Sequence, residues 1–175
     1  YSKEFLCRAC CRKRCLDLIH MLQQEDSMLL FAEPVTDKVA PNYHDVIREP
    51  MDLQTMLIRA GREEYGNYAW VREMFELVVL NALTFNRYHT TFWNEAIRYH
   101  QACLTNVFET MGKAAPPGRY EAAIQENLEK ATEAKLMEVD RVQEDKSTEK
   151  KDLVAGAQVA TIVLRALRDA PPDQA

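Results

Sequence analysis

The stretch Trp70-Val-Arg-Glu-Met-Phe-Glu-Leu-Val-Val-Leu-Asn-Ala-Leu-Thr-Phe85, followed by Asn86, is a long and mostly apolar run. Its apolar residues fall on most faces of a helix, which indicates a helix that is buried on nearly all sides. We expect this central helix to span about Tyr68 to Phe85. The side chains expected to be buried are those of Trp70, Met74, Phe75, Leu77, Val78, Leu80 and Leu83.

Asn86, at the end of this helix, has two interpretations. It can simply end the helix, because asparagine tolerates the left-handed conformation and bonds to nearby backbone. Its amide can instead stand at the mouth of a cavity and offer one acceptor and two donors to a ligand. The local pattern alone favours the helix end, so the choice depends on the rest of the sequence.

A long connection precedes the central helix and is unusual in composition. Residues 31–50 contain three prolines, each of which disfavours helix for itself and for the residue before it. A polar surface loop would not carry the apolar residues Phe31, Val35, Val39, Tyr43, Val46 and Ile47. We therefore expect a long loop folded against a core, and long ordered loops are often functional.

Three further helices are predicted around the central one. Apolar residues at helical spacing indicate a first helix from about residue 3 to Leu30. Asp52 is a good N-cap for a short helix that ends near Gly61, and a last helix is expected from Thr91 to Met111. Residues 1–112 are thus predicted to form a four-helix bundle with one long crossover after the first helix.

The rest of the chain differs in composition. Residues 113–118 form a linker of Pro and Gly, and residues 119–175 a charged extension rich in Glu, Lys and Ala. We expect two helices in the extension, separated near Ser147-Thr148. The first has an apolar stripe of Tyr120, Ile124, Leu128 and Ala131, and the second repeats Leu153, Ala157, Ala160, Leu164 and Leu167 at heptad-like spacing. Packing on the bundle, on each other or on a partner chain all remain open, and the short heptad stretch favours the bundle's exterior.

Composition disfavours several classes of protein. The chain has only five glycines and neither G-x-G-x-x-G nor G-x-x-x-x-G-K-[ST], which argues against a nucleotide site. No Ser/His/Asp, Cys/His or H-E-x-x-H arrangement stands out, so we expect no enzyme and no cofactor. No apolar run approaches the roughly 20 residues of a membrane helix, and nothing points to secretion.

Two clusters near the N-terminus also invite a functional interpretation. Cysteines 7, 11 and 15 share one helix face with Cys10 nearby, but zinc would require paired knuckles and a second pair elsewhere. Reduced thiols are therefore favoured and no metal site is predicted, with zinc as the alternative. A basic face, which could touch nucleic-acid phosphate or an acidic partner but is more typical of a solvated helix end, consists of Lys3, Arg8, Arg12, Lys13 and Arg14.

With the crossover and the helix-ending Asn in place, the sequence resembles a bromodomain, the acetyl-lysine-binding four-helix module. The resemblance rests on Phe31-Ala-Glu-Pro-Val35, Pro41-Asn-Tyr43-His-Asp-Val-Ile47, Pro50-Met51-Asp52-Leu53 and Thr84-Phe85-Asn86. It implies an all-α fold: a left-handed four-helix bundle of bromodomain type with a long loop between helices 1 and 2. One or two additional C-terminal helices would follow.

The resemblance also implies a binding site. Asn86 matches the anchor whose side-chain NH₂ donates to the acetyl carbonyl, and Tyr43 matches the tyrosine that reaches this carbonyl through a water. Phe92 falls at the gatekeeper position that narrows the cavity. The remaining wall residues are Phe31, Val35, Val39 and, in place of a frequent tyrosine, Phe85. The family's Trp-Pro-Phe shelf reads Leu29-Leu30-Phe31 here, so less aromatic surface is expected.

The function implied is that of a non-catalytic reader of acetylated lysine, on histone tails or other acetylated proteins. A nuclear chromatin or transcription factor would be its setting, with no membrane. The alternative is a scaffold of bromodomain fold that binds acetyl-lysine weakly or not at all. Such a scaffold would act through protein contacts of residues 119–170.

Overall fold

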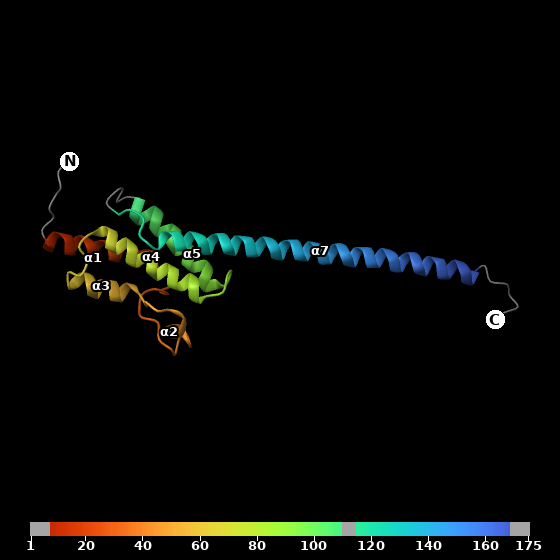
Figure 1. Ribbon diagram of the computed structural model, residues 1–175, viewed down its shortest axis with the longest axis horizontal. Coiled ribbons are helices and arrows are strands. Elements are labelled where there is room, and N and C mark those ends of the chain that lie inside the picture. The colour runs from red at the N-terminus through yellow and green to blue at the C-terminus, as the bar shows by residue number, and fades with distance from the viewer. Residues whose placement is uncertain (1–7, 110–114, 169–175) are drawn as a thin grey trace. The chain divides into compact units, whose positions relative to one another are not determined.

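The computed structural model describes residues 8–109 and 115–168, with backbone alone for residues 144–150 and 152–168 (Figure 1). Every element in these ranges is a helix. The elements are α1 (Arg8–Glu25), α2 (Tyr43–Val46), α3 (Leu53–Gly61), α4 (Tyr68–Phe85), α5 (Thr91–Cys103), the π-helical turn η1 (Leu104–Phe108) and α7 (Glu121–Arg168). The bounds predicted for α3 and α4 are confirmed, whereas the predicted last helix divides into α5 and η1, with its expected end at Met111 outside the described residues.

Helices α1, α3, α4 and α5 lie side by side and enclose the core (Figure 1). The core consists of apolar side chains from all four, such as Ile19, Met56, Phe75 and Tyr99, each of which is fully buried. Trp70 contradicts the sequence analysis, because its side chain is 52% exposed. When most faces of a helix are apolar, the sequence does not show which of them the other helices cover. Trp70, in the first turn of α4, lies beside the charged side chains of Arg59 in α3 and Glu64 in the following loop.

The first helix ends earlier than predicted, at Glu25 rather than near Leu30. The buried carboxylate of Asp26 accepts hydrogen bonds from the backbone N–H groups of Leu30 (3.0 Å) and Phe31 (2.9 Å). A short acidic side chain offers the backbone an alternative to the helix in this way, so the chain turns here. The turn also places Leu29 in the left-handed region, with φ 52°.

The long crossover is ordered and tied down at both ends. At its start, the carbonyl oxygen of Phe31 accepts a hydrogen bond from the N–H of Leu53 at 2.9 Å. At its end, Asn81 Nδ2 of α4 donates to the carbonyl oxygen of Glu49 at 2.9 Å. The carboxylate of Asp52 caps α3 by accepting from the N–H of Thr55 at 2.8 Å, as predicted. These bonds hold the crossover over the C-terminal half of α4.

The chain divides into two compact units, residues 1–131 and residues 132–175. In the first unit, Ile124 and Ala131 of α7 are buried in the bundle's core cluster, so the predicted packing of this stripe on the bundle is found. The break expected near Ser147-Thr148 is wrong, because α7 is one continuous helix. Ser, Thr and Lys each cost at most about 0.7 kcal/mol relative to alanine, and no proline interrupts the helix.

Candidate functional site

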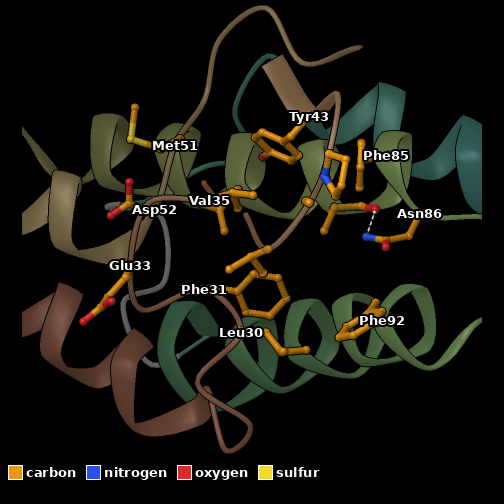
Figure 2. A pocket seen from close by; sticks show the side chains of 15 residues that line it. Leu30, Phe31, Glu33, Val35, Tyr43, Met51, Asp52, Phe85, Asn86 and Phe92 are labelled. Carbon is orange, nitrogen blue, oxygen red and sulfur yellow. Dashed lines mark hydrogen bonds between the residues drawn. The ribbon is translucent and has the colours of Figure 1, made fainter. Parts of the chain in front are cut away.

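A cavity of about 300 Å³ opens between the crossover, the end of α4 and the start of α5 (Figure 2). Its lining includes all seven residues singled out from the sequence: Phe31, Val35, Val39, Tyr43, Phe85, Asn86 and Phe92. They come from the crossover, α2, α4 and α5, and only the folded bundle brings them together. The walls are mostly apolar, as expected of a small-ligand site with few polar groups.

Asn86 follows α4 and lies at one end of this cavity (Figure 2). Asn86 is the C-cap of α4, as the helix-ending interpretation expected, but its backbone is extended (φ −89°, ψ 142°) and not left-handed. Its side-chain Nδ2 donates to the carbonyl oxygen of Ala82 at 2.8 Å, which fixes the orientation of the amide. The amide's second N–H has no partner among the described residues and remains available to a ligand.

Tyr43 stands in the cavity wall on the short helix α2. Its ring is buried and meets the ring of Phe85 edge-on, with centroids 5.0 Å apart. Burial raises the pKa of the Tyr43 hydroxyl, with the nearby charge of Asp52 adding to this effect, so the hydroxyl keeps its proton at neutral pH. This hydroxyl makes no hydrogen bond to another described side chain or backbone group, which leaves it able to bind water or ligand.

Phe31 forms part of both the cavity wall and the core. Its ring stacks on that of Tyr99 at 4.6 Å, and the Tyr99 hydroxyl donates to the carbonyl oxygen of Leu22 at 3.1 Å. Leu30 lines the cavity beside it, whereas Leu29 is 73% exposed and does not line it. The shelf is therefore Leu30-Phe31 rather than the three residues that the sequence suggested, because the turn at Asp26 places Leu29 outside.

The rim of the cavity carries two exposed apolar side chains. Val39 on the crossover is 81% exposed, and Phe92 in the first turn of α5 is 54% exposed. Exposing large apolar side chains to water is unfavourable for the protein without a ligand. Exposed apolar surface beside a pocket is typical of a binding site. A ligand entering the cavity would cover part of both.

Several lining residues were not singled out from the sequence. Val78 lies two turns and Ala82 one turn before Asn86, so the i, i+4, i+8 spacing could have identified them as the same face of α4. Met51 and Asp52 belong to the motif that carried the resemblance, yet no ligand role was expected for them. The carboxylate of Asp52 is already engaged by the backbone and hydroxyl of Thr55.

Only part of the two N-terminal clusters lies within the described residues. No three His, Cys, Asp or Glu side chains there lie close enough to hold a metal, and Cys7 and Lys3 fall outside this region. Cys11 Sγ donates to the carbonyl oxygen of Gly66 at 3.2 Å. Burial, with Cys11 nearby, raises the pKa of Cys15 to about 12, so this thiol stays protonated. Within the same described residues, no helix is long and apolar enough to cross a membrane.

Comparisons with known proteins fit this geometry. The bromodomain family model matches residues 15–98. Residues 15–98 are a bromodomain. Bromodomain-containing protein 9 of Xenopus laevis is 36% identical over 97 residues, and that of Mus musculus is 35% identical over 108 residues. These matches cover 55% and 62% of this chain but only 18% and 17% of the relatives, so the chain spans under a fifth of their length.

Solved bromodomain structures show the same arrangement of helices. One from Trypanosoma cruzi has a TM-score of 0.54 and 27% identity, covering 60% of this chain and 96% of its own. One from Trypanosoma brucei, solved with bromosporine, has a TM-score of 0.54 and 26% identity, covering 58% of this chain and 87% of its own. The predicted fold class is confirmed, with α7 as the one additional C-terminal helix in the part of the chain that the structure describes.

Proposed function

We propose that this bromodomain is a non-catalytic reader that binds acetylated lysine in the cavity beside Asn86. Bromodomains as a family are acetyl-lysine-binding modules, and the observation that supports this role here is the pairing of apolar walls with two available polar groups. These are the second N–H of Asn86 and the hydroxyl of Tyr43. Histone tails are the proposed source of the acetylated lysine, and a nuclear chromatin or transcription factor the proposed setting.

The cavity suits an acetylated lysine and disfavours an unmodified one. Acetylation replaces a hydrated cation by a neutral amide, which apolar walls accept at little cost. An ammonium group would lose its hydration and require a counter-charge, at a cost of several kcal/mol. The acidic lining residues Glu33 and Asp52 lie at the end of the cavity away from Asn86 (Figure 2), and Asp52 is already engaged by Thr55.

Asn86 would supply the hydrogen bond that a buried acetyl carbonyl needs. A buried acceptor without a partner costs about 1–3 kcal/mol. Because an amide donates without carrying charge, it stabilises the carbonyl without introducing a buried ion. Its bond to Ala82 holds the amide in place before the ligand arrives, which lowers the entropic cost of binding. Tyr43 would reach the same carbonyl through an ordered water.

Calorimetric titration with matched acetylated and unmodified histone-tail peptides tests this proposal. The acetylated peptide should bind, the unmodified one should not, and Asn86→Ala should abolish binding while helix content by circular dichroism stays the same. Asn106→Ala is the matched control, because the side chain of this exposed asparagine bonds, among the described residues, to Glu25 on the surface at 3.0 Å. Normal binding by Asn86→Ala would show that the anchor is elsewhere.

The source of the acetylated lysine needs a second measurement. An array of acetylated histone peptides identifies preferred tails, and fluorescence microscopy of the tagged parent protein shows whether it is nuclear. Binding that is confined to acetylated peptides from other proteins would retain the reader function and remove the histone assignment.

A scaffold function is the second candidate, and the second unit of the chain favours it. There α7 exposes Leu136, Met137, Val139 and Val142 along a helix that continues to Arg168. Isolated helices are marginal in water, so a partner along residues 119–170 would stabilise this one. A scaffold would bind acetylated peptides weakly or not at all but would form a stable dimer or heteromer in sedimentation experiments.

A further inference from the structure

The loop between α4 and α5 is connected to α7 through His89. His89 Nε2 lies 3.2 Å from the carbonyl oxygen of Ala131, and because a carbonyl only accepts, the imidazole donates this bond. The His89 backbone is in the left-handed region (φ 63°), and its ring meets that of Trp93 at 5.3 Å. A residue other than glycine holds this conformation only where its surroundings fix it, so these contacts determine the loop's course.

The same loop supports two lining residues of the binding cavity. Asn86 stands at its start, and Phe92 follows its end in the first turn of α5. The carbonyl oxygen of His89 also accepts a hydrogen bond from Asn94 Nδ2 at 3.2 Å, which ties the loop to α5. A displacement of His89 would therefore shift the positions of both Asn86 and Phe92.

The start of α7 is docked on the bundle by a buried polar network away from the cavity. Glu121 lies 3.5 Å from Arg72 Nη2 and 3.4 Å from His100 Nε2. Just before the helix, the N–H of Gly118 donates to Glu76 Oε1 at 2.8 Å. A Cβ at Gly118 would stand 2.5 Å from Glu76 Oε2, so the chain approaches α4 here as only glycine can.

We propose that the docking of residues 121–131 of α7 on the bundle sets the affinity of the binding site. His89 is the positioning residue that links these residues to the site. This inference rests on the proposed acetyl-lysine function. Docking through Glu121 and Gly118 fixes the position of the Ala131 carbonyl, which accepts the hydrogen bond from His89. His89 in turn holds the loop that presents Asn86 and Phe92 to the cavity. Whatever engages α7 would then change the affinity for acetyl-lysine, and the ligand would change the docking of α7 by the same factor.

The experiment uses the full chain and changes each end of this connection separately. His89→Asn keeps a residue that tolerates the left-handed backbone but is too short to reach Ala131. Gly118→Ala disturbs the docking, and Glu121→Gln is a milder second variant; neither residue lines the cavity. His20→Ala is the control, because His20 is exposed on α1 and its described hydrogen bond is to Gln23, far from α7 and the loop.

Two readouts are measured: the Kd for an acetylated histone peptide and the hydrogen-exchange rates of the amides from Arg87 to Thr91. His89→Asn should weaken binding about two- to tenfold, the equivalent of one lost hydrogen bond, and accelerate exchange in the loop. Gly118→Ala and Glu121→Gln should also weaken binding and accelerate exchange in the loop, although both residues lie away from it. His20→Ala should change neither the Kd nor the exchange rates. Because the residues act in series, His89→Asn combined with Gly118→Ala should weaken binding less than the product of the single effects.

The outcomes separate this inference from the proposed function. If the wild type binds no acetylated peptide, the function is wrong, and the exchange rates still decide whether α7 holds the loop. Unchanged exchange in both His89→Asn and Glu121→Gln overturns the inference. So does faster exchange with an unchanged Kd, or full additivity of the double variant, in a chain that binds the peptide.

Discussion

The first half of α4 and the residue that follows its C-terminal end differ in how their polar side chains are paired. In the first half, Arg72 Nε donates to Glu76 Oε1 at 3.0 Å, and Glu121 and Gly118 complete the contacts. Just after the helix, the half-buried Asn86 has one side-chain N–H without a described partner, at the edge of an apolar cavity. Polar groups that the protein pairs with itself hold the fold together, whereas those left at a cavity are available to a ligand.

The first half also shows the cost of burying charge. Glu76 is 0% exposed, and its Oε2 is buried without a hydrogen-bond partner among the described residues. Burial raises the pKa of Glu76, although the Gly118 N–H and Arg72 oppose this effect. The network positions the start of α7 through Gly118 and Glu121, whereas a buried ion pair contributes little net stability.

The largest expected effect is on stability, in the first half of α4. Glu76→Ala leaves the buried guanidinium of Arg72 with only the more distant Glu121 and should lower the free energy of unfolding by about 3 kcal/mol. Urea unfolding measures this. Glu73→Ala, one turn away in an exposed pair with Arg119, is the control and should change stability little. Equal losses in both variants would show that the buried network has no special role.

The next effect is on binding alone, at the cavity beside the C-terminal end of α4. Tyr43→Phe removes a hydroxyl that bonds to no described residue, so thermal stability should stay unchanged. The affinity for an acetylated peptide should fall by about 1 kcal/mol, the net value of a typical hydrogen bond. Calorimetry measures the affinity. An unaltered Kd would remove Tyr43 from the polar part of the site and leave Asn86 as its only described donor.

A smaller effect is expected at the rim. Phe92→Val removes much of an exposed side chain that borders the cavity, so the mouth should widen and the preference among acetylated peptides should shift. Stability should change by less than about 0.5 kcal/mol, since exposed substitutions are usually nearly neutral. A peptide array compares the two proteins. Identical preferences would argue against a gatekeeper role for Phe92.

The smallest effect is a gradual dependence of stability on pH. Burial lowers the pKa of His100 from its ordinary 6.5, against the opposing effect of Glu121, while Arg72 acts in the same direction as burial. The folded state therefore favours neutral His100. Its contribution to stability is full above pH 6.5 and is lost as the pH falls from there toward the folded-state pKa.

Thermal midpoints measured between about pH 7.5 and pH 5 check this sign, since that range brackets the usual histidine pKa. His100→Asn should flatten the profile, and His20→Asn, which alters an exposed histidine, should leave it unchanged. A profile that rises on acidification would mean that His100 is charged in the folded state.

Much of the fold followed from local patterns. The bounds of α4, the Asp52 cap and the end of α3 at Gly61 were predicted because they depend on periodicity and on hydrogen bonds between neighbours in sequence. The end of α1 was not predicted, because it depends on hydrogen bonds from the backbone N–H groups of Leu30 and Phe31 to the carboxylate of Asp26. The continuity of α7 was not predicted. Residues with low helix propensity, such as Ser147 and Thr148, destabilise a helix by too little to interrupt it.

The sequence by itself identified seven of the residues that line the cavity, through the resemblance of its motifs to a family. Tertiary structure alone decided how they are used: the extended backbone of Asn86, its bond to Ala82 and the exposure of Leu29. The connection from Glu121 through Ala131 to His89 likewise joins residues up to 42 positions apart. Such contacts depend on packing of distant elements, which no local pattern of side chains encodes.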